Sequence, residues 1–190
     1  MRVAGRTVAS GDLPPLLKGR LPKMQNGTGF EPIESFSSDD HCFACGSKNP
    51  FGLHMKLSSD GQTVAAHVMV PSHLCGWGNL VHGGIITTLL DETMSWAAIH
   101  LLKRLILTRT IEIRFILPVP PNTLLRTEGS IERQIKNTEA LVRAVLLDED
   151  NRVCATATGR FALLSAKMMR RMKIMNEQTI TDFANRYEQD

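Results

Sequence analysis

The sequence lacks any long apolar segment. None of its hydrophobic runs reaches the roughly 20 residues that a membrane-spanning helix needs. Lys103 and Arg104 interrupt the apolar stretch that ends at Leu107. The first residues include Arg2 and Arg6 but no apolar core of the kind found in a secretory signal. We therefore expect a cytoplasmic protein without a membrane partner.

A strong charge of either sign is also missing. The 22 Lys and Arg residues nearly balance the 19 Asp and Glu residues, which leaves a net charge of +3. This charge is too small and too scattered to favour nucleic acid as a partner, and we expect none. The 43% hydrophobic and 22% charged content is ordinary for a globular chain, and 190 residues can bury a core without disulfides.

Cysteine is scarce, with four residues in the chain. Cys42 and Cys45 form a Cys-x-x-Cys pair, and His41 and His54 lie nearby, which is one way to supply zinc ligands. No second Cys-x-x-Cys or His pair follows at finger-like spacing, and no βαβ pattern supports a redox pair. The pair is thus interpreted as a tight turn with two small buried thiols. We expect free thiols, no metal and no organic cofactor.

Residues 85–102 contain neither proline nor glycine and predict one long helix. Apolar side chains cover most of its surface, which indicates burial on most sides. The polar positions form one narrow stripe of mostly small side chains, Gly84, Thr88, Asp91, Glu92 and Ser95. Another backbone or a ligand can approach such a face closely. Alternatively, the two acids belong to the solvated side of an amphipathic helix.

His82, Gly83 and Gly84 stand where this helix begins. Paired glycines leave backbone N–H groups accessible in the first turn, where the helix dipole favours negative charge. The pattern therefore predicts an oxyanion hole. His82 is alternatively a purely structural residue.

The distance between the glycines and the acid has a consequence for assembly. Gly83 and Asp91 are eight positions apart, about 12 Å along a helix, which is too far for one small reacting group to touch both. Two copies of the helix, antiparallel across a two-fold axis, would bring the Gly83 end of one to the middle of the other. We therefore expect a homo-oligomer with two equivalent sites per dimer.

These features resemble a known family. Val81-His82-Gly83-Gly84, then Asp91, then Thr108 in a strand that ends at Pro118, is similar to the hotdog-fold acyl-CoA thioesterases of the PaaI-like branch. The resemblance covers about residues 41–164. It implies an α+β fold, in which a curved antiparallel sheet of about six strands wraps a long central helix.

The resemblance also implies an acyl-CoA substrate and a role for each residue. The Gly83 N–H would polarise the thioester carbonyl, and Asp91 of the partner subunit would act as nucleophile or general base. His82 would orient the thioester, and a hydroxyl from Ser95 or Thr108 would assist. The resemblance implies a homodimer or a homotetramer built as a dimer of dimers.

One position departs from the family pattern. Many members carry Asn or Gln seven residues before the helix glycine, where this chain has Gly76. Asn79 is close but out of register, so His82 would carry more of the positioning of water.

The remaining substrate-binding candidates are polar residues of the helix stripe and nearby cations. A basic rim near the end of the helix would suit the phosphates of CoA. It is equally consistent with the sequence that each of these basic residues is a solvent-exposed surface charge that binds no ligand. The candidates are Gly84, Asn79, Glu92, Lys103, Arg104 and Arg109, with Arg114 beyond them.

Alternating apolar residues predict six strands around the helix. Their ranges are 53–57, 63–70, 108–118, 123–134, 138–147 and 152–164. Residues 1–40 are interpreted as an extension that is either partly disordered or docked on the domain through Leu13, Leu16, Leu17 or Phe36. Residues 41–164 form the domain, and 165–190 form a helical tail whose amphipathic face is made by Met168, Met169, Met172 and Met175.

Two other functions stay open at this point. A non-catalytic acyl-CoA-binding protein would keep the groove without turnover that depends on Asp91. A hotdog hydratase or dehydratase is less favoured, because the differently spaced motif of that class is absent. The acyl group itself is not predicted.

Overall fold

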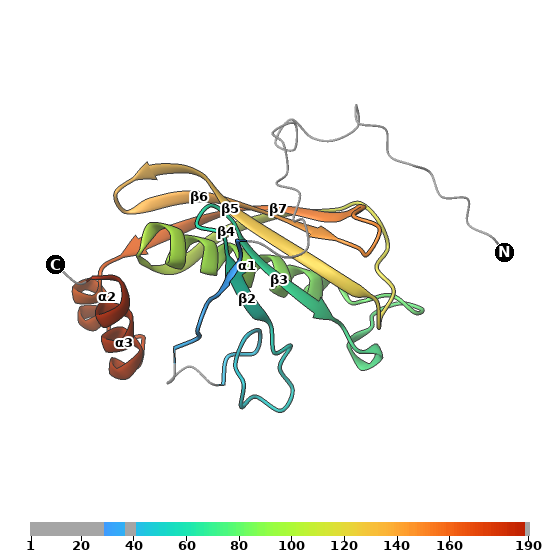
Figure 1. The fold of residues 1–190 in the computed structure, drawn as a ribbon, viewed down its shortest axis with the longest axis horizontal. Helices are drawn as coiled ribbons and strands as arrows, with labels where there is room; N and C mark the ends of the chain where they lie inside the picture. Colours follow the sequence, from blue (N-terminus) through green and yellow to red (C-terminus); the bar gives the residue numbers. More distant parts are fainter. Residues whose placement is uncertain (1–28, 37–40, 189–190) are drawn as a thin grey trace.

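The computed structural model describes residues 29–36 and 41–188. One long helix, α1, lies against a seven-stranded antiparallel sheet in the order β1-β2-β3-β5-β6-β7-β4 (Figure 1). In chain order the elements are β1 (Glu31–Pro32), β2 (Lys56–Ser59), β3 (Val64–Met69), a 3-10 turn (Ser72–Leu74), α1 (Gly83–Leu102), β4 (Leu105–Phe115), β5 (Leu124–Lys136), β6 (Glu139–Leu147), β7 (Val153–Leu164), α2 (Ala166–Met172) and α3 (Glu177–Tyr187).

The core lies between α1 and the sheet. Leu89, Leu90 and Met94 of α1 are fully buried, and burying a side chain of this size contributes about 1.5–3 kcal/mol. At Gly129 of β5, a Cβ atom would lie 2.9 Å from the backbone oxygen of Thr93. Glycine at this position therefore lets the helix backbone pack directly on the strand.

The predicted α+β fold with one long helix and an antiparallel sheet is confirmed. The sheet has seven strands rather than six because the two-residue β1 pairs with β2. The strand predicted at 108–118 instead spans Leu105–Phe115. It begins earlier because Lys103, with φ of 52°, ends α1 and turns the chain straight into pairing with β7.

β4 lies at one edge of the sheet and pairs with β7 on its inner side. Among the described residues no strand pairs with its outer side. Its apolar side chains after Leu105 are only half-buried, and Phe115 is 57% exposed. A long edge strand of this kind is a template for pairing with another chain.

The segments outside the helix and sheet contact one end of α1. Phe36 stacks on Trp96, with 5.5 Å between ring centroids, and His100 of α1 hydrogen-bonds the hydroxyl of Tyr187 at 3.0 Å. Figure 1 shows α2 and α3 together beyond the end of β7. Leu13, Leu16 and Leu17, which were expected to dock, lie outside the described residues.

The methionine face predicted for the C-terminal tail is not formed as a unit. α2 ends at Met172, so Met175 lies beyond it, and the chain re-forms a helix only at Glu177. Met169 is buried while Met168 and Met172 are each 45% exposed. The domain boundaries expected after residues 40 and 164 stay predictions. No helix in the described part of the chain is long and apolar enough to cross a membrane.

Candidate functional site

The first turn of α1 has one unused backbone donor. His82 is the N-cap, and its ring atom Nδ1 accepts a hydrogen bond of 2.9 Å from the Gly84 N–H. The N–H groups of Ile85 and Ile86 both donate to the His82 carbonyl. Within residues 29–36 and 41–188, the Gly83 N–H donates to no acceptor. A half-buried donor at a helix N-terminus is suited to bind a developing negative charge.

Gly83 and Gly84 have different surroundings. A Cβ atom at Gly84 would lie 3.0 Å from Nδ1 of His82, so glycine makes room for the capping ring. A Cβ atom at Gly83 would lie 3.5 Å from the ring of Phe115, which is an ordinary contact. Since Nδ1 accepts a hydrogen bond, the ring proton of neutral His82 sits on Nε2.

Asp91 faces β4. Its Oδ1 accepts a hydrogen bond of 3.1 Å from the hydroxyl of Thr108. Burial raises the pKa of the Asp91 carboxyl above its usual range, and the Thr108 hydrogen bond opposes part of that rise. The structure thus brings together two of the predicted catalytic residues within one protomer.

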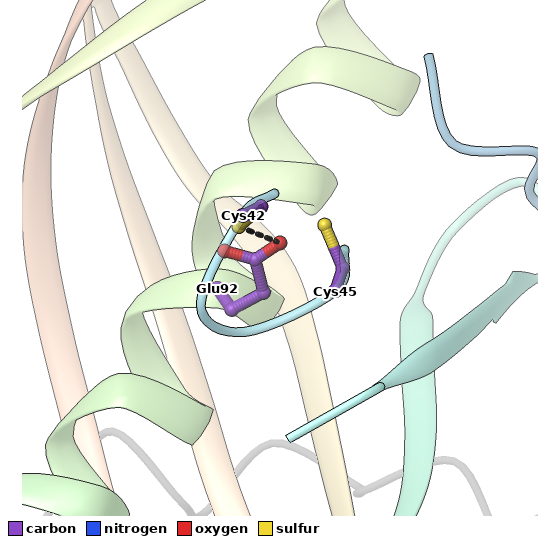
Figure 2. A group of neighbouring side chains, drawn as sticks. All are labelled: Cys42, Cys45 and Glu92. Atoms are coloured by element: carbon purple, nitrogen blue, oxygen red, sulfur yellow. Dashed lines mark hydrogen bonds between the residues drawn. The ribbon is translucent and has the colours of Figure 1, made fainter. Parts of the chain in front are cut away.

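Glu92, the next residue, faces the loop that carries Cys42 and Cys45 (Figure 2). Its Oε1 accepts a hydrogen bond of 2.9 Å from the Trp96 indole N–H and lies 4.0 Å from Sγ of Cys42. Burial raises the pKa of Glu92 to about 7, and the charge of Cys42 adds to the rise. The hydrogen bond with Cys42, burial and the charge of Glu92 together raise the pKa of the Cys45 thiol.

The other two hydroxyl residues of the stripe, Ser95 and Thr88, lie within α1 on either side of Asp91. Ser95, one turn after Asp91, is 9% exposed. The Thr88 hydroxyl donates to the Gly84 carbonyl at 3.0 Å. Asn79 is exposed in the loop before α1.

The predicted basic residues are spread out rather than gathered. Lys103 and Arg104 are exposed at the C-terminal end of α1, and Arg109 is exposed at the β-bulge of β4. From Arg104, Arg109 is about 16 Å along the strand and Arg114 about 33 Å. Arg114 instead forms an exposed salt bridge of 3.5 Å with Glu112. One protomer alone thus forms no compact basic rim.

Gly76, the position that departs from the family pattern, lies against His82. A Cβ atom at Gly76 would be 3.2 Å from Cδ2 of the imidazole. An Asn or Gln at position 76, as many family members have, would therefore place its side chain beside the His82 ring.

Two residues at the site were not expected from sequence. Trp96 holds Glu92, and their i, i+4 spacing was a usable signal. Phe115 lies at the far end of β4 beside Gly83, and no local pattern connects the two.

The long central helix and the antiparallel sheet define the class of the fold, an α+β domain of the hotdog type. Residues 78–155 match the family model described as thioesterase superfamily, which confirms the resemblance seen in the sequence. No curated protein matches the chain.

Solved structures agree on the fold. A thioesterase superfamily protein is 23% identical with a TM-score of 0.59, and the match covers 65% of this chain but only 60% of that one. The E. coli PaaI protein from the phenylacetic acid degradation operon is 14% identical, with a TM-score of 0.54 over 59% of this chain and 80% of that one. A hypothetical thioesterase with coenzyme A from Streptococcus pneumoniae TIGR4 is 18% identical, with a TM-score of 0.51 over 54% and 81%.

Proposed function

We propose that the protein hydrolyses an acyl-CoA thioester to a free acid and CoA, as a member of the PaaI-like branch. This proposal rests on two features of the same helix. The Gly83 N–H at the start of α1 has no acceptor among the described residues, and the partly desolvated Asp91 carboxylate accepts a hydrogen bond from Thr108. The coenzyme A in the pneumococcal structure supports the choice of thiol.

The active unit of this proposal is a dimer. α1 is continuous from Gly83 to Leu102, so Gly83 and Asp91 of one chain stay about 12 Å apart. The outer edge of β4 is available to pair antiparallel with β4 of a second copy. Such pairing would set the two α1 helices antiparallel and bring each Gly83 toward the partner's Asp91. A dimer of dimers would keep both sites.

In the proposed reaction, the thioester carbonyl accepts a hydrogen bond from the Gly83 N–H, and the helix dipole stabilises the charge that forms on its oxygen. In one route Asp91 removes a proton from the attacking water and returns it to the sulfur of CoA as the C–S bond breaks. In the other, Asp91 attacks the carbonyl carbon and forms an anhydride, the CoA thiolate leaves and takes a proton from water, and a second water molecule hydrolyses the anhydride to the free acid. A raised pKa makes Asp91 a stronger base than an exposed aspartate. Thr108 fixes the carboxylate.

The remaining residues have supporting roles in this proposal. His82 holds the first turn and offers its Nε2–H to orient the thioester beside Gly76. Ser95, one helical turn from Asp91, supplies a second hydroxyl. The pneumococcal thioesterase has been solved with an aspartate replaced by alanine and, separately, with a threonine replaced by alanine. The same two residue types meet here as Asp91 and Thr108.

The phosphates of CoA require cations that one protomer does not gather. In the proposed dimer, antiparallel β4 strands would place Lys103, Arg104 and Arg109 of each chain along the shared interface. The exposed Asn79 and the accessible backbone of Gly84 lie beside Gly83 in sequence and would contact the ligand near its reacting end.

The test is release of free CoA from a panel of acyl-CoA and aryl-CoA thioesters by wild type and Asp91→Asn. We expect turnover by wild type on one substrate class and its loss in the variant, while CoA still binds. CoA binding without turnover on any thioester would replace this proposal with a non-catalytic acyl-CoA-binding protein.

A further inference from the structure

Three potential ligand atoms converge at a site away from the Asp91 carboxylate. Cys42 and Cys45 come from the loop before β2, and Glu92 comes from α1, fifty positions after Cys42. One ligand atom from each of the three lies within 4.8 Å of the others. Figure 2 shows the loop curving around the carboxylate so that both sulfur atoms face it.

The spacing of these atoms is close to that of a tetrahedral zinc site. Zn–S bonds of about 2.3 Å and Zn–O bonds of about 2.0–2.2 Å place neighbouring ligand atoms roughly 3.5–3.8 Å apart. Sγ of Cys42 and Oε1 of Glu92 are already 4.0 Å apart. The remaining separations are within 4.8 Å, so each must shorten by no more than about 1.3 Å for the three residues to coordinate one ion.

The charge at this site also favours a cation. Glu92 is half-buried, and its neighbours are thiols and the neutral indole N–H of Trp96. No lysine or arginine of the described residues forms a salt bridge with it. A partly buried carboxylate is costly without a counter-charge, and a divalent metal would supply one.

A cavity reaches one of the three ligand residues, Cys45. Cys45 and Trp96 help to line a cavity of about 420 Å³, which also includes His54. This cavity is large enough to admit a hydrated ion and to leave a water molecule as a fourth ligand.

We propose that Cys42, Cys45 and Glu92 bind one zinc ion, with water in the fourth position. Both thiols bind as thiolates, so two protons pass to solvent as the ion binds. The ion would tie the 41–46 loop to α1 one residue from Asp91. This departs from the expectation of no metal that the sequence favoured, because the third ligand is remote in sequence from the pair.

The test measures metal on the protein itself and is independent of any thioesterase turnover. The full chain is purified with reductant, stripped with chelator, loaded with zinc, desalted and assayed for zinc by atomic emission. We expect about one zinc per chain in wild type and in Cys75→Ser, a matched control that removes a half-buried thiol outside the cluster. Cys42→Ser and Cys45→Ser should lose the ion, and Glu92→Gln should bind it at least tenfold more weakly.

A second measurement needs no variant. Cobalt loaded into wild type should give a thiolate-to-cobalt charge-transfer band and the strong visible bands of a tetrahedral site. Absence of these bands, absence of zinc after desalting, or equal zinc in Cys42→Ser and wild type would each overturn the proposal. Formation of a Cys42–Cys45 disulfide in the presence of reductant and zinc would do the same.

Discussion

Asp91 and Glu92 are neighbours in sequence and lie in different surroundings. Asp91 accepts a hydrogen bond from Thr108 on the edge strand β4, where a second chain can approach. Glu92 is turned about 100° around α1 and faces two thiols and an indole N–H inside the same protomer. Adjacent positions on a buried helix therefore face different partners, and the polar stripe predicted from sequence divides between these two environments.

Replacing Asp91 by Asn should separate the two acids most strongly. The amide cannot act as a base or nucleophile, so we expect turnover to fall by about 100- to 10,000-fold. Zinc content should stay at the wild-type level, because Asp91 is not among the three ligands. Asp150→Asn, in the exposed turn between β6 and β7, is the control for loss of one acid. Retention of turnover in Asp91→Asn would remove Asp91 from the reaction.

Replacing Gly83 by Pro should delete the proposed oxyanion donor and little else. Proline is well tolerated at the first helical position, and His82, with φ −60° and ψ 135°, already has the backbone conformation favoured before proline. Loss of one such donor costs about 100- to 1,000-fold in kcat. Gly83→Ala keeps the N–H and serves as the matched control. Similar losses in both variants would point to crowding near Phe115 rather than to a missing donor.

Replacing Thr108 by Val removes only the partner of Asp91. The Thr108 hydrogen bond lowers the pKa of Asp91, so its removal should raise that pKa further. Because the ionised form is the active base, the acid limb of the pH–rate profile should move to higher pH, and kcat should fall by about tenfold. Thr110→Val, beyond the bulge on the same strand, should leave the profile in place. An acid limb unchanged by Thr108→Val would mean that Asp91 does not set it.

The smallest expected effect is at the start of the helix. His82→Ala removes the acceptor for the Gly84 N–H, and loss of an N-cap costs about 1 kcal/mol in the free energy of unfolding. His82→Asn should retain the cap and the stability, as measured by urea unfolding. If His82 also orients the thioester, turnover falls in both variants. If its role is only structural, His82→Asn keeps full turnover.

Much of this architecture was readable from local pattern. The His82-Gly83-Gly84 start and the absence of proline and glycine over 85–102 fixed α1 within one or two residues. Alternating apolar residues located β3 to β7, and the family spacing singled out Asp91 together with Thr108. These are short-range signals, which periodicity and spacing carry well.

Contacts between residues far apart in the chain could not be predicted from local sequence patterns. Glu92 was predicted to bind substrate because it lies beside Asp91 in the polar stripe of α1, whereas its side chain meets Cys42, fifty positions earlier. The cations after α1 are close in sequence, yet an extended strand carries Arg109 and Arg114 away from Arg104. In both cases the fold sets the neighbours, and sequence proximity misleads.

Each proposed site joins Gly83 of one chain to Asp91 of its partner, and subunit complementation tests this sharing most directly. Gly83→Pro and Asp91→Asn chains, each inactive alone, would be co-expressed with different tags, and the mixed dimers assayed for CoA release. One intact site per mixed dimer is expected, which corresponds to about half of wild-type activity for mixed dimers isolated by both tags and about one quarter for the unfractionated mixture after random assortment. No recovery, with mixed dimers isolated by both tags, would contradict a site shared between two chains.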